Sequence, residues 1–378
     1  MRNSVIGLIV GTVLGIVFGA TVIAPRLQRT APGTTATAPT PTPAELAKQL
    51  PRALVPRPDV SMKMANAFPP DTPVAGELAR RIDAHIWDVS RGQFEVRSYP
   101  PGALAPVSDL FEAVGSGGID AAFAPSPSGS KSPPALALFS GIPFGPDIEE
   151  FLGWMEFGGG RALLDELNQE NGVHGILCGL LPPSALGWFR QELQSPQEFR
   201  SLRINASGLT KKALTRLGAE VVDLPVGELT VAIEQGAVDA VGWASPMLDK
   251  SMAFGTWLKN YYPQGWNQLL TPLQLMINQK KWQSLNATQK AQIESVCGDN
   301  VRHSIAEGES GQFKALQEIY AAGVHLQRLP PSVRDALERA WQQVVQQESN
   351  ADPQFRRVWE SLSTFHANFA VWRELSRP

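Results

Sequence analysis

The sequence predicts a two-lobed α/β clamp with long helices at its C-terminal end. Three observations lead to this fold class. Strand and helix patterns alternate from residue 59 to residue 125 in the order β-α-β-α-β, which is typical of a largely parallel sheet. A second alternating series follows, and residues 110–124 and 229–244 share one plan of helix, glycine, Ile/Val-Asp-Ala and strand. Two such units facing one another would place strand ends and helix starts around a central cleft.

Residues 1–29 are predicted to form a membrane anchor. Residues 5–25 carry no charge and have about the length of a membrane-spanning helix, roughly 20 residues. This run is longer than the apolar region of a usual cleaved signal peptide, about 7–15 residues, so an uncleaved anchor is favoured and a cleaved leader is the alternative. Four glycines recur every fourth residue and would let another helix approach, although glycine is also common in membrane helices. They are Gly7, Gly11, Gly15 and Gly19.

Residues 30–58 are predicted to be a tether. Seven prolines fall between Pro32 and Pro58, mixed with threonine and alanine. This composition favours a semi-extended chain over a packed element. It would hold a globular body some distance from a membrane.

The first lobe is predicted at residues 59–183, completed by parts of 273–378. Its second element has apolar residues at helical spacing, namely Leu78, Ile82, Ile86 and Val89, and ends at Gly92. The expected elements are a strand at 59–68, a helix at 74–92, a strand at 93–100, and a helix, glycine turn and buried strand at 107–125.

The second lobe is predicted at residues 184–272. Strands are expected at 202–206, 219–225 and 239–246, with helices at 208–218 and 226–238. After Trp282 the pattern turns helical almost to the end, with long amphipathic candidates at 286–323 and 331–350. Residues 306–378 are therefore assigned to C-terminal helices.

Charge and motif patterns exclude several classes of function. The net charge of −3 gives no indication of nucleic-acid binding. Three glycines precede a helical pattern at 158–160, but no Gly-Lys-Ser/Thr follows, so we interpret them as a helix start. No Gly-x-Ser-x-Gly elbow is present, and no catalytic constellation supports an enzyme. The five histidines are too far apart for metal-ligand spacing, so neither a metal nor a cofactor is predicted.

The two cysteines, Cys178 and Cys297, are too few for a disulfide framework. Free cysteine is among the most buried residue types, so we expect both to be buried and unpaired. A single bridge between them is the alternative in an oxidising compartment.

From about Lys63 to Glu374 the chain resembles the periplasmic solute-binding subunits of TRAP transporters, the DctP-like proteins. It is most similar to the branch that binds α-keto acids. The resemblance rests on a Gly-x-Ile-Asp strand, a lysine-proline loop and a Pro-Phe-Gly turn at 117–145, and on the Gly-Trp-Phe-Arg stretch at 187–205. Its most specific part is 214–255, and 261–285 and 352–365 continue it in the same order. It implies a periplasmic-binding-protein-like clamp, type II-like, that closes over a small ligand.

Several binding positions depart from the family pattern. The arginine that the resemblance implies as a forked clamp for the ligand carboxylate is Asn205 here. A polar amide that helps hold ligand and cation is replaced by Ser184, and a cation-holding glutamate by Gly242. Trp243 is retained, while aromatic lining is lost around Ser126. Without arginine and glutamate, the pocket would change from charged and ion-bridged to neutral.

The other side chains near these positions have ordinary structural interpretations. Trp243 and Trp188 could both be core residues, and for Trp188 we favour that interpretation. Arg190 more often makes a structural ion pair in such a position than a ligand contact. Lys131 could replace the missing cation, but a loop lysine is usually solvated.

The predicted function is an extracytoplasmic receptor of a TRAP-type transport system. It would close over a small organic solute that is not an ordinary cation-bridged α-keto acid, and pass it to membrane permease subunits. The alternative is a membrane-tethered scaffold or sensor that keeps the clamp fold without ligand transfer. The expected location is the periplasm, at the inner membrane if the leader is kept, and the C-terminal helices could pair in a homodimer. The predicted ligand-lining residues are Phe68, Ser126, Ser184, Asn205, Gly242, Trp243, Pro246, Trp266 and Gln268.

Overall fold

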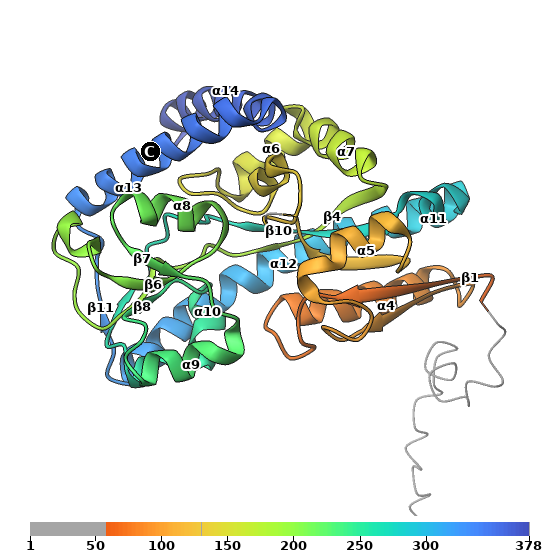
Figure 1. Ribbon diagram of the computed structural model, residues 1–378. Coiled ribbons are helices and arrows are strands. Elements are labelled where there is room, and N and C mark those ends of the chain that lie inside the picture. Colours follow the sequence, from red (N-terminus) through yellow and green to blue (C-terminus); the bar gives the residue numbers. More distant parts are fainter. Residues whose placement is uncertain (1–57, 130, 378) are drawn as a thin grey trace, which may run out of the picture. The chain divides into compact units, whose positions relative to one another are not determined.

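The computed structural model describes residues 58–129 and 131–377 (Figure 1). The predicted anchor lies outside these residues, as does the tether except for Pro58. Among the described residues, no helix combines the length and the apolar character needed to cross a membrane. The described part of the chain belongs to one compact unit that starts at Pro56.

The first sheet, sheet A, has five strands in the order β2-β1-β3-β10-β4. β1 is parallel to β2 and β3, while β10 runs antiparallel to β3 and β4. The strands are β1 (Val60–Asn66), β2 (Phe94–Tyr99), β3 (Ala121–Pro125), β10 (Thr271–Asn278) and β4 (Val173–Leu181). β10 enters the sheet at the edge where β3 and β4 end, so it runs antiparallel to both and the sheet is mixed and not wholly parallel.

The second sheet, sheet B, has six short strands in the order β11-β9-β5-β8-β6-β7. β6 is parallel to β7 and β8, while β5 runs antiparallel to β8 and β9. The strands are β11 (His325–Leu326), β9 (Asn260–Tyr262), β5 (Gly187–Phe189), β8 (Ala240–Val241), β6 (Arg203–Asn205) and β7 (Glu220–Val222). The two sheets confirm the predicted two-part α/β architecture.

Helices cover both sheets. Leu78, Ile82 and Ile86 of α4 lie on one helical face and are fully buried in the core beneath sheet A. The helices associated with the sheets are α4 (Ala75–Val89), α5 (Leu110–Ser116), α6 (Ile148–Phe157), α7 (Gly160–Glu170), α8 (Gly208–Arg216), α9 (Val226–Glu234), α10 (Pro246–Asp249) and α11 (Gln279–Ser284). α7 begins at Gly160, so the triple glycine is a helix start, as predicted.

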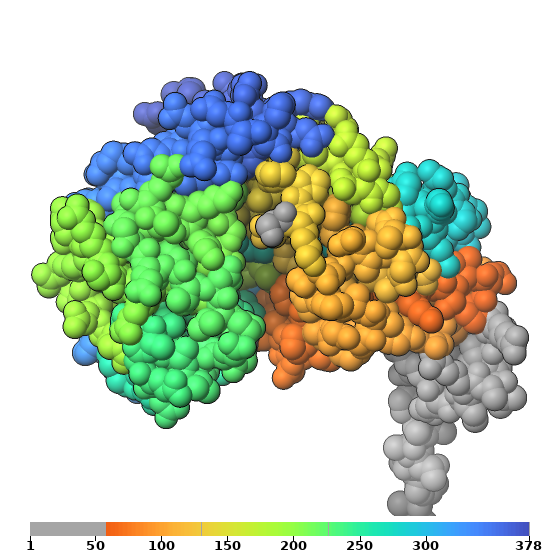
Figure 2. All heavy atoms as spheres, in the orientation of Figure 1, coloured from red at the N-terminus to blue at the C-terminus, as the bar shows by residue number. Residues whose placement is uncertain are grey.

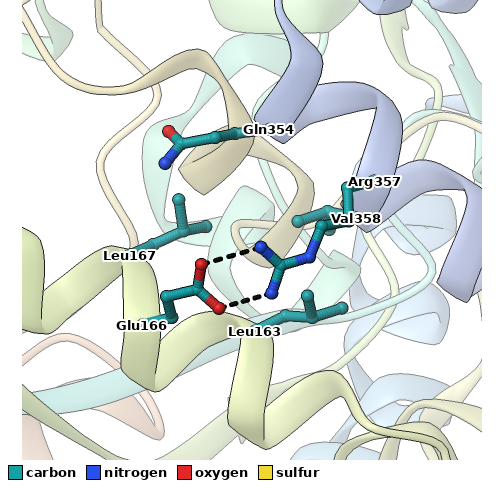
Figure 3. A pocket seen from close by; sticks show the side chains of 6 residues that line it. All are labelled: Leu163, Glu166, Leu167, Gln354, Arg357 and Val358. Atoms are coloured by element: carbon teal, nitrogen blue, oxygen red, sulfur yellow. Dashed lines mark hydrogen bonds and ion pairs between the residues drawn. The ribbon is translucent and has the colours of Figure 1, made fainter.

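Three long helices end the chain: α12 (Ala287–Ala321), α13 (Pro331–Ala351) and α14 (Pro353–Ser376). α12 starts with a capping box of Asn286 and Gln289 and packs against β4 and α4 at one end and α10 at the other (Figure 1). α13 packs on α8, and α14 packs on α6 and α7. Between α7 and α14 lies a cavity of about 10 Å³ beside the ion pair of Glu166 and Arg357, with space for little more than one water (Figure 3).

Cys178 in β4 and Cys297 in α12 form a disulfide, so the expectation of two unpaired cysteines is wrong. Both side chains are buried, and their Cα atoms are 4.2 Å apart. The pairing of β4 with β10 shifts register between Leu273 and Gln274, which leaves Cys178 as the extra residue in β4. A bulge changes the direction in which a side chain points, and here the Cys178 side chain reaches Cys297 of α12.

Candidate functional site

Several strands of sheet A end at one edge. β1 and β3 are parallel, so their last residues, Asn66 and Pro125, lie at the same end of the sheet. β10 starts at this edge, since Leu273 is opposite Pro125 and Thr271 is opposite Leu181, the last residue of β4. The predicted site residues Phe68 and Ser126 follow β1 and β3, so the topology places both at this edge.

Sheet B has a corresponding edge. β6 and β8 are parallel and end at Asn205 and Val241, which are register partners. Gly242 and Trp243 therefore follow directly beside Asn205. β5 begins at this edge with Gly187, opposite the end of β9, so the residues before β5 and after β9 also gather here.

Two segments, 182–186 and 263–270, connect these edges of the two sheets. Ser184 N donates to the Gln268 carbonyl at 2.9 Å, and Ser184 Oγ donates to Gln268 Oε1 at 3.3 Å. Ala185 N donates to the Ala244 carbonyl at 2.8 Å, next to Trp243. Five of the predicted residues, Ser184, Asn205, Gly242, Trp243 and Gln268, are thus joined by direct bonds or by strand register.

The two sheet-bearing parts also approach one another across this region. A Cβ atom at Gly208, at the start of α8, would lie only 3.5 Å from Oγ of Ser128, two residues beyond Ser126. Figure 2 shows a hollow between the orange segments that include β1 to β3 and the green segments that include α8 and α9. The converging edges lie at this junction, which is therefore the candidate ligand site.

Asn205 is buried at the end of β6, with an exposed fraction of 7%. Its Oδ1 accepts a hydrogen bond from Leu224 N at 2.9 Å, so the side chain fixes the segment that follows β7. A backbone N–H can only donate, which fixes the orientation of the amide. Nδ2 has no hydrogen-bond partner among the described residues and keeps its two donors.

Gly242 is closely fitted between strands. A Cβ atom there would lie 3.0 Å from the Leu186 carbonyl oxygen, tighter than ordinary contact. Trp243 is half-buried and packs against the core of sheet B, while Pro246 is buried as the first residue of α10. The backbone here has no room for a larger side chain at position 242 without a shift of a few tenths of an ångström.

A buried acid that the sequence analysis missed supports the Trp243 loop. Asp249, the last residue of α10, is fully buried; Oδ1 accepts from Ala244 N at 2.9 Å and Oδ2 from Tyr261 OH at 3.0 Å. Burial raises the pKa of Asp249 to about 8, although these bonds and the nearby Trp188 indole oppose the rise. Burial and the neighbouring carboxylate also raise the pKa of Tyr261. No motif marks Asp249, because its role depends on a strand 12 residues away.

Trp188 is a core residue, as favoured from the sequence. Its exposed fraction is 2%, and its ring lies 4.4 Å from the Tyr261 ring, centroid to centroid. Trp266 likewise belongs to a core, with an exposed fraction of 3% and its ring 5.7 Å from that of Phe144. Its backbone carbonyl accepts from Phe144 N at 2.6 Å. Trp266 therefore fixes the 263–270 segment through its buried ring and its backbone bond to Phe144.

On the sheet A side, Ser126 ends a buried chain of polar groups. Asn168 Nδ2 donates to Gln274 Oε1 at 3.0 Å, and Gln274 Nε2 donates to Ser126 Oγ. Asn168, Gln274 and Ser126 are all nearly inaccessible to solvent. Phe68 is half-buried and packs against the core beneath sheet A. Asn66, which the sequence analysis did not select, is 6% exposed, and its Oδ1 has no hydrogen-bond partner among residues 58–129 and 131–377.

Four cationic side chains near this region form ion pairs. Lys131 is 73% exposed and binds Asp109 3.1 Å away, so it turns to solvent as a loop lysine usually does. Arg203 forms a forked pair with Asp239, with both bonds at 2.8 Å. Arg190 makes the expected structural ion pair. The pairs are Lys131–Asp109, Arg190–Asp239, Arg203–Asp239 and Lys211–Asp223. Within residues 58–129 and 131–377, no cluster of three or more His, Cys, Asp or Glu could hold a metal ion.

Comparison with known proteins decides the family. The model of the bacterial extracellular solute-binding protein family 7 (DctP) matches residues 64–351. The chain belongs to this family. The resemblance drawn from the sequence is therefore confirmed, and with it a periplasmic solute-binding receptor of the TRAP type.

Relatives of this family 7 receptor include proteins with known ligands. A monocarboxylate 2-oxoacid-binding periplasmic protein of Nostoc is 23% identical over 84% of this chain and 87% of its own. A TRAP solute-binding protein of Bordetella bronchiseptica, solved with calcium and picolinate, is 26% identical, with a TM-score of 0.79 over 84% and 95% of the two chains. One from Pseudoalteromonas atlantica, solved with sodium and pyruvate, is 25% identical, with a TM-score of 0.78 over 84% and 97%.

Proposed function

We propose that this protein is a TRAP-type receptor whose cleft closes over a small, uncharged organic solute for delivery to membrane permease subunits. Family membership and the two-sheet fold support the receptor. The proposal that the ligand is uncharged rests mainly on the side chain at position 205. An amide stands there and its oxygen accepts from Leu224 N, while Lys131, Arg203 and Lys211 on neighbouring elements form ion pairs with aspartates.

The energetics favour a ligand without a buried carboxylate. Moving an ion out of water into a closed cleft costs several kcal/mol unless it is paired. The free Nδ2 group of Asn205 offers hydrogen bonds worth about 1 kcal/mol each, somewhat more to a charged acceptor. Gly242 supplies no anionic ligand for a bridging cation. A carboxylate would therefore lose more in desolvation than these side chains return.

The test compares ligand binding by the wild-type chain and two arginine variants. Differential scanning fluorimetry and calorimetry would use pyruvate and other small monocarboxylates with the full chain. We expect no binding by the wild type and a gain of anion binding in Asn205→Arg. Asn350→Arg is the matched control, because Asn350 lies exposed at the end of α13. Saturable pyruvate binding by the wild type would refute the neutral cleft.

The membrane and partner assignments complete the proposal. Residues 5–25 would anchor the receptor at the inner membrane, and residues 30–58 would tether the body. The last turns of α14 expose Val371, Trp372 and Leu375, which is consistent with pairing of C-terminal helices in a homodimer. A tethered scaffold without ligand transfer is the outcome if neither the wild type nor Asn205→Arg binds any small molecule.

A further inference from the structure

We infer that the protein has a second binding site, outside the cleft, for an organic anion with an apolar body, such as an aromatic carboxylate. The site is a cavity of about 620 Å³ beside sheet B. This volume lies within the range of about 300–1,000 Å³ that is usual for small-ligand pockets. None of the predicted ligand-lining residues borders the cavity. The inference therefore goes beyond the proposed function and does not depend on it.

The sheet B cavity, as we call it, is formed by β5 together with residues 249–259 and 318–324, which include the end of α12. Its floor is buried and aromatic. Trp188 of β5 and Phe254 pack edge to face there, with their ring centroids 6.5 Å apart. These rings give the cavity a fixed apolar base beneath an exposed rim.

The backbone of residues 249–259 is shaped around the cavity. Ala253 lines it with a φ of 53°, in the left-handed region that residues with a Cβ atom rarely adopt. Gly255 lines it too, and a Cβ atom there would lie 2.8 Å from Val324 Cγ2, so only glycine fits without a shift. Strained positions of this kind gather at functional sites and ligand clamps. The conformation of this wall therefore supports a binding role.

The rim carries an excess of positive charge. Lys250 Nζ lies 2.6 Å from Glu318 Oε2, so these two charges offset one another. Lys259 Nζ donates to the Gly255 carbonyl at 2.7 Å and forms no ion pair with any residue in 58–129 or 131–377. An ammonium group has three N–H donors, which leaves two of them for a ligand. Asp249 adds little negative charge at pH 7, because burial raises its pKa to about 8.

An amphipathic anion uses both features of this rim. Its charged group would accept from Lys259, while its apolar body would contact the exposed methyl groups of Ala253 and Ala322 and the lysine side-chain stems. An ammonium ligand would face Lys259 and find Glu318, a carboxylate already paired with Lys250. Acetate would reach Lys259 but leave the apolar contacts unused. The charge and the methyl groups together therefore favour an anion with an apolar body.

The experiment measures the binding of three matched probes to the full chain by calorimetry at pH 7. The probes are 2-naphthoate, 2-naphthamide and 2-naphthylmethylamine, which share a ring system and differ in charge. We expect saturable binding of 2-naphthoate at one site and affinities lower by about tenfold or more for the other two, the effect of one charge-assisted hydrogen bond. Absence of 2-naphthoate binding, or equal binding of the amide, would overturn the inference.

Two variants locate the bound probe. Lys259→Gln removes the charge, and 2-naphthoate affinity should fall about tenfold or more. Ala322→Phe keeps the charge and fills the cavity from its rim, so binding should be lost. Both positions are exposed, and we expect the Tm of the free variants to stay near that of the wild type. Lys280→Gln is the matched control and should bind like the wild type, because Lys280 is exposed in α11, away from the cavity.

The variants also separate the site from the ligand class. Affinity for 2-naphthoate that Ala322→Phe leaves unchanged would place the probe elsewhere and overturn the site. Affinity lost in Ala322→Phe but unchanged in Lys259→Gln would overturn the anionic class. Pyruvate has only a methyl group as its apolar part, so we expect no binding of pyruvate to this cavity. Because pyruvate tests the cleft and 2-naphthoate tests the sheet B cavity, either proposal can fail while the other stands.

Discussion

The substitution Asp249→Asn tests how the Trp243 loop is supported. Asp249 is fully buried, its two oxygens accept from Ala244 N and Tyr261 OH, and burial raises its pKa from an ordinary 3.8 to about 8. At pH 7 the folded protein therefore keeps this carboxyl group largely protonated. Asparagine has nearly the same shape, is neutral at every pH, and retains one acceptor oxygen.

The sign of the pH effect follows from proton binding in the two states. Between about pH 4 and pH 8 the unfolded chain has lost the proton of Asp249 while the folded chain retains it. The folded state binds more protons, so the free energy of unfolding falls as the pH rises. The contribution is fully present below the unfolded pKa and is lost as the pH rises through the folded pKa. One group gives a slope of about 1.4 kcal/mol per pH unit.

The assay is urea unfolding of both proteins at pH 5 and pH 7, followed by tryptophan fluorescence. From pH 5 to pH 7, the free energy of unfolding of the wild type should fall by about 3 kcal/mol more than that of Asp249→Asn. The hydrogen bond that asparagine cannot make adds an offset that does not depend on pH. Asp335→Asn, at an exposed position of α13, is the control and should keep the wild-type slope. Parallel slopes in the wild type and Asp249→Asn would refute a protonated, buried Asp249.

Two further predictions concern stability away from the site. Replacing both Cys178 and Cys297 with alanine should lower the free energy of unfolding by about 3–5 kcal/mol, because the disulfide closes a loop with a sequence separation of 119 residues; equal urea midpoints for oxidised wild type and variant would contradict this. His366 Nδ1 lies 2.6 Å from Glu150 Oε1, whose side chain is 1% exposed and whose pKa is raised by burial. His366→Ala should cost about 1–3 kcal/mol at pH 7, because the buried carboxyl group of Glu150 loses this hydrogen-bond partner, and less at pH 4, where the raised pKa of Glu150 favours its neutral form; equal thermal shifts at both pH values would contradict this.

Local patterns were sufficient to predict most of the fold. The helical spacing of Leu78, Ile82 and Ile86 predicts α4, because those side chains face the same core. The spacing also placed Val89 on that face, but Val89 is 51% exposed at the helix end. The sequence patterns that indicate helices, turns and strands span only a few residues, so they can be recognised without knowing the tertiary structure. The lobe boundaries at residues 183 and 272 stay predictions.

The interactions that define the site are not local. Asn66 has the same sequence context as any strand end, and only the fold shows that its oxygen is buried without a partner in the part of the chain that the structure describes. Asp249 matters because Ala244 and Tyr261 converge on it, and Cys178, the extra residue of a strand bulge, is bonded to Cys297, which is 119 residues away in the sequence. Each feature depends on which atoms come together from distant segments. A single sequence carries no direct signal for that.

The two charge losses that the family resemblance implies, at positions 205 and 242, would differ in how they are built into the structure. Arginine at position 205 would replace one side chain and give up its bond to Leu224 N, a cost of about 1 kcal/mol. Glutamate at position 242 would also bring a Cβ atom to 3.0 Å from the carbonyl oxygen of Leu186, the residue before β5, which would have to shift by a few tenths of an ångström. A glutamate at position 242 is therefore opposed by a backbone contact, whereas an arginine at position 205 requires only the loss of one side-chain hydrogen bond. We therefore expect that a change at position 205 alone can alter the charge of the ligand, whereas a glutamate at position 242 also requires the Leu186 carbonyl to shift.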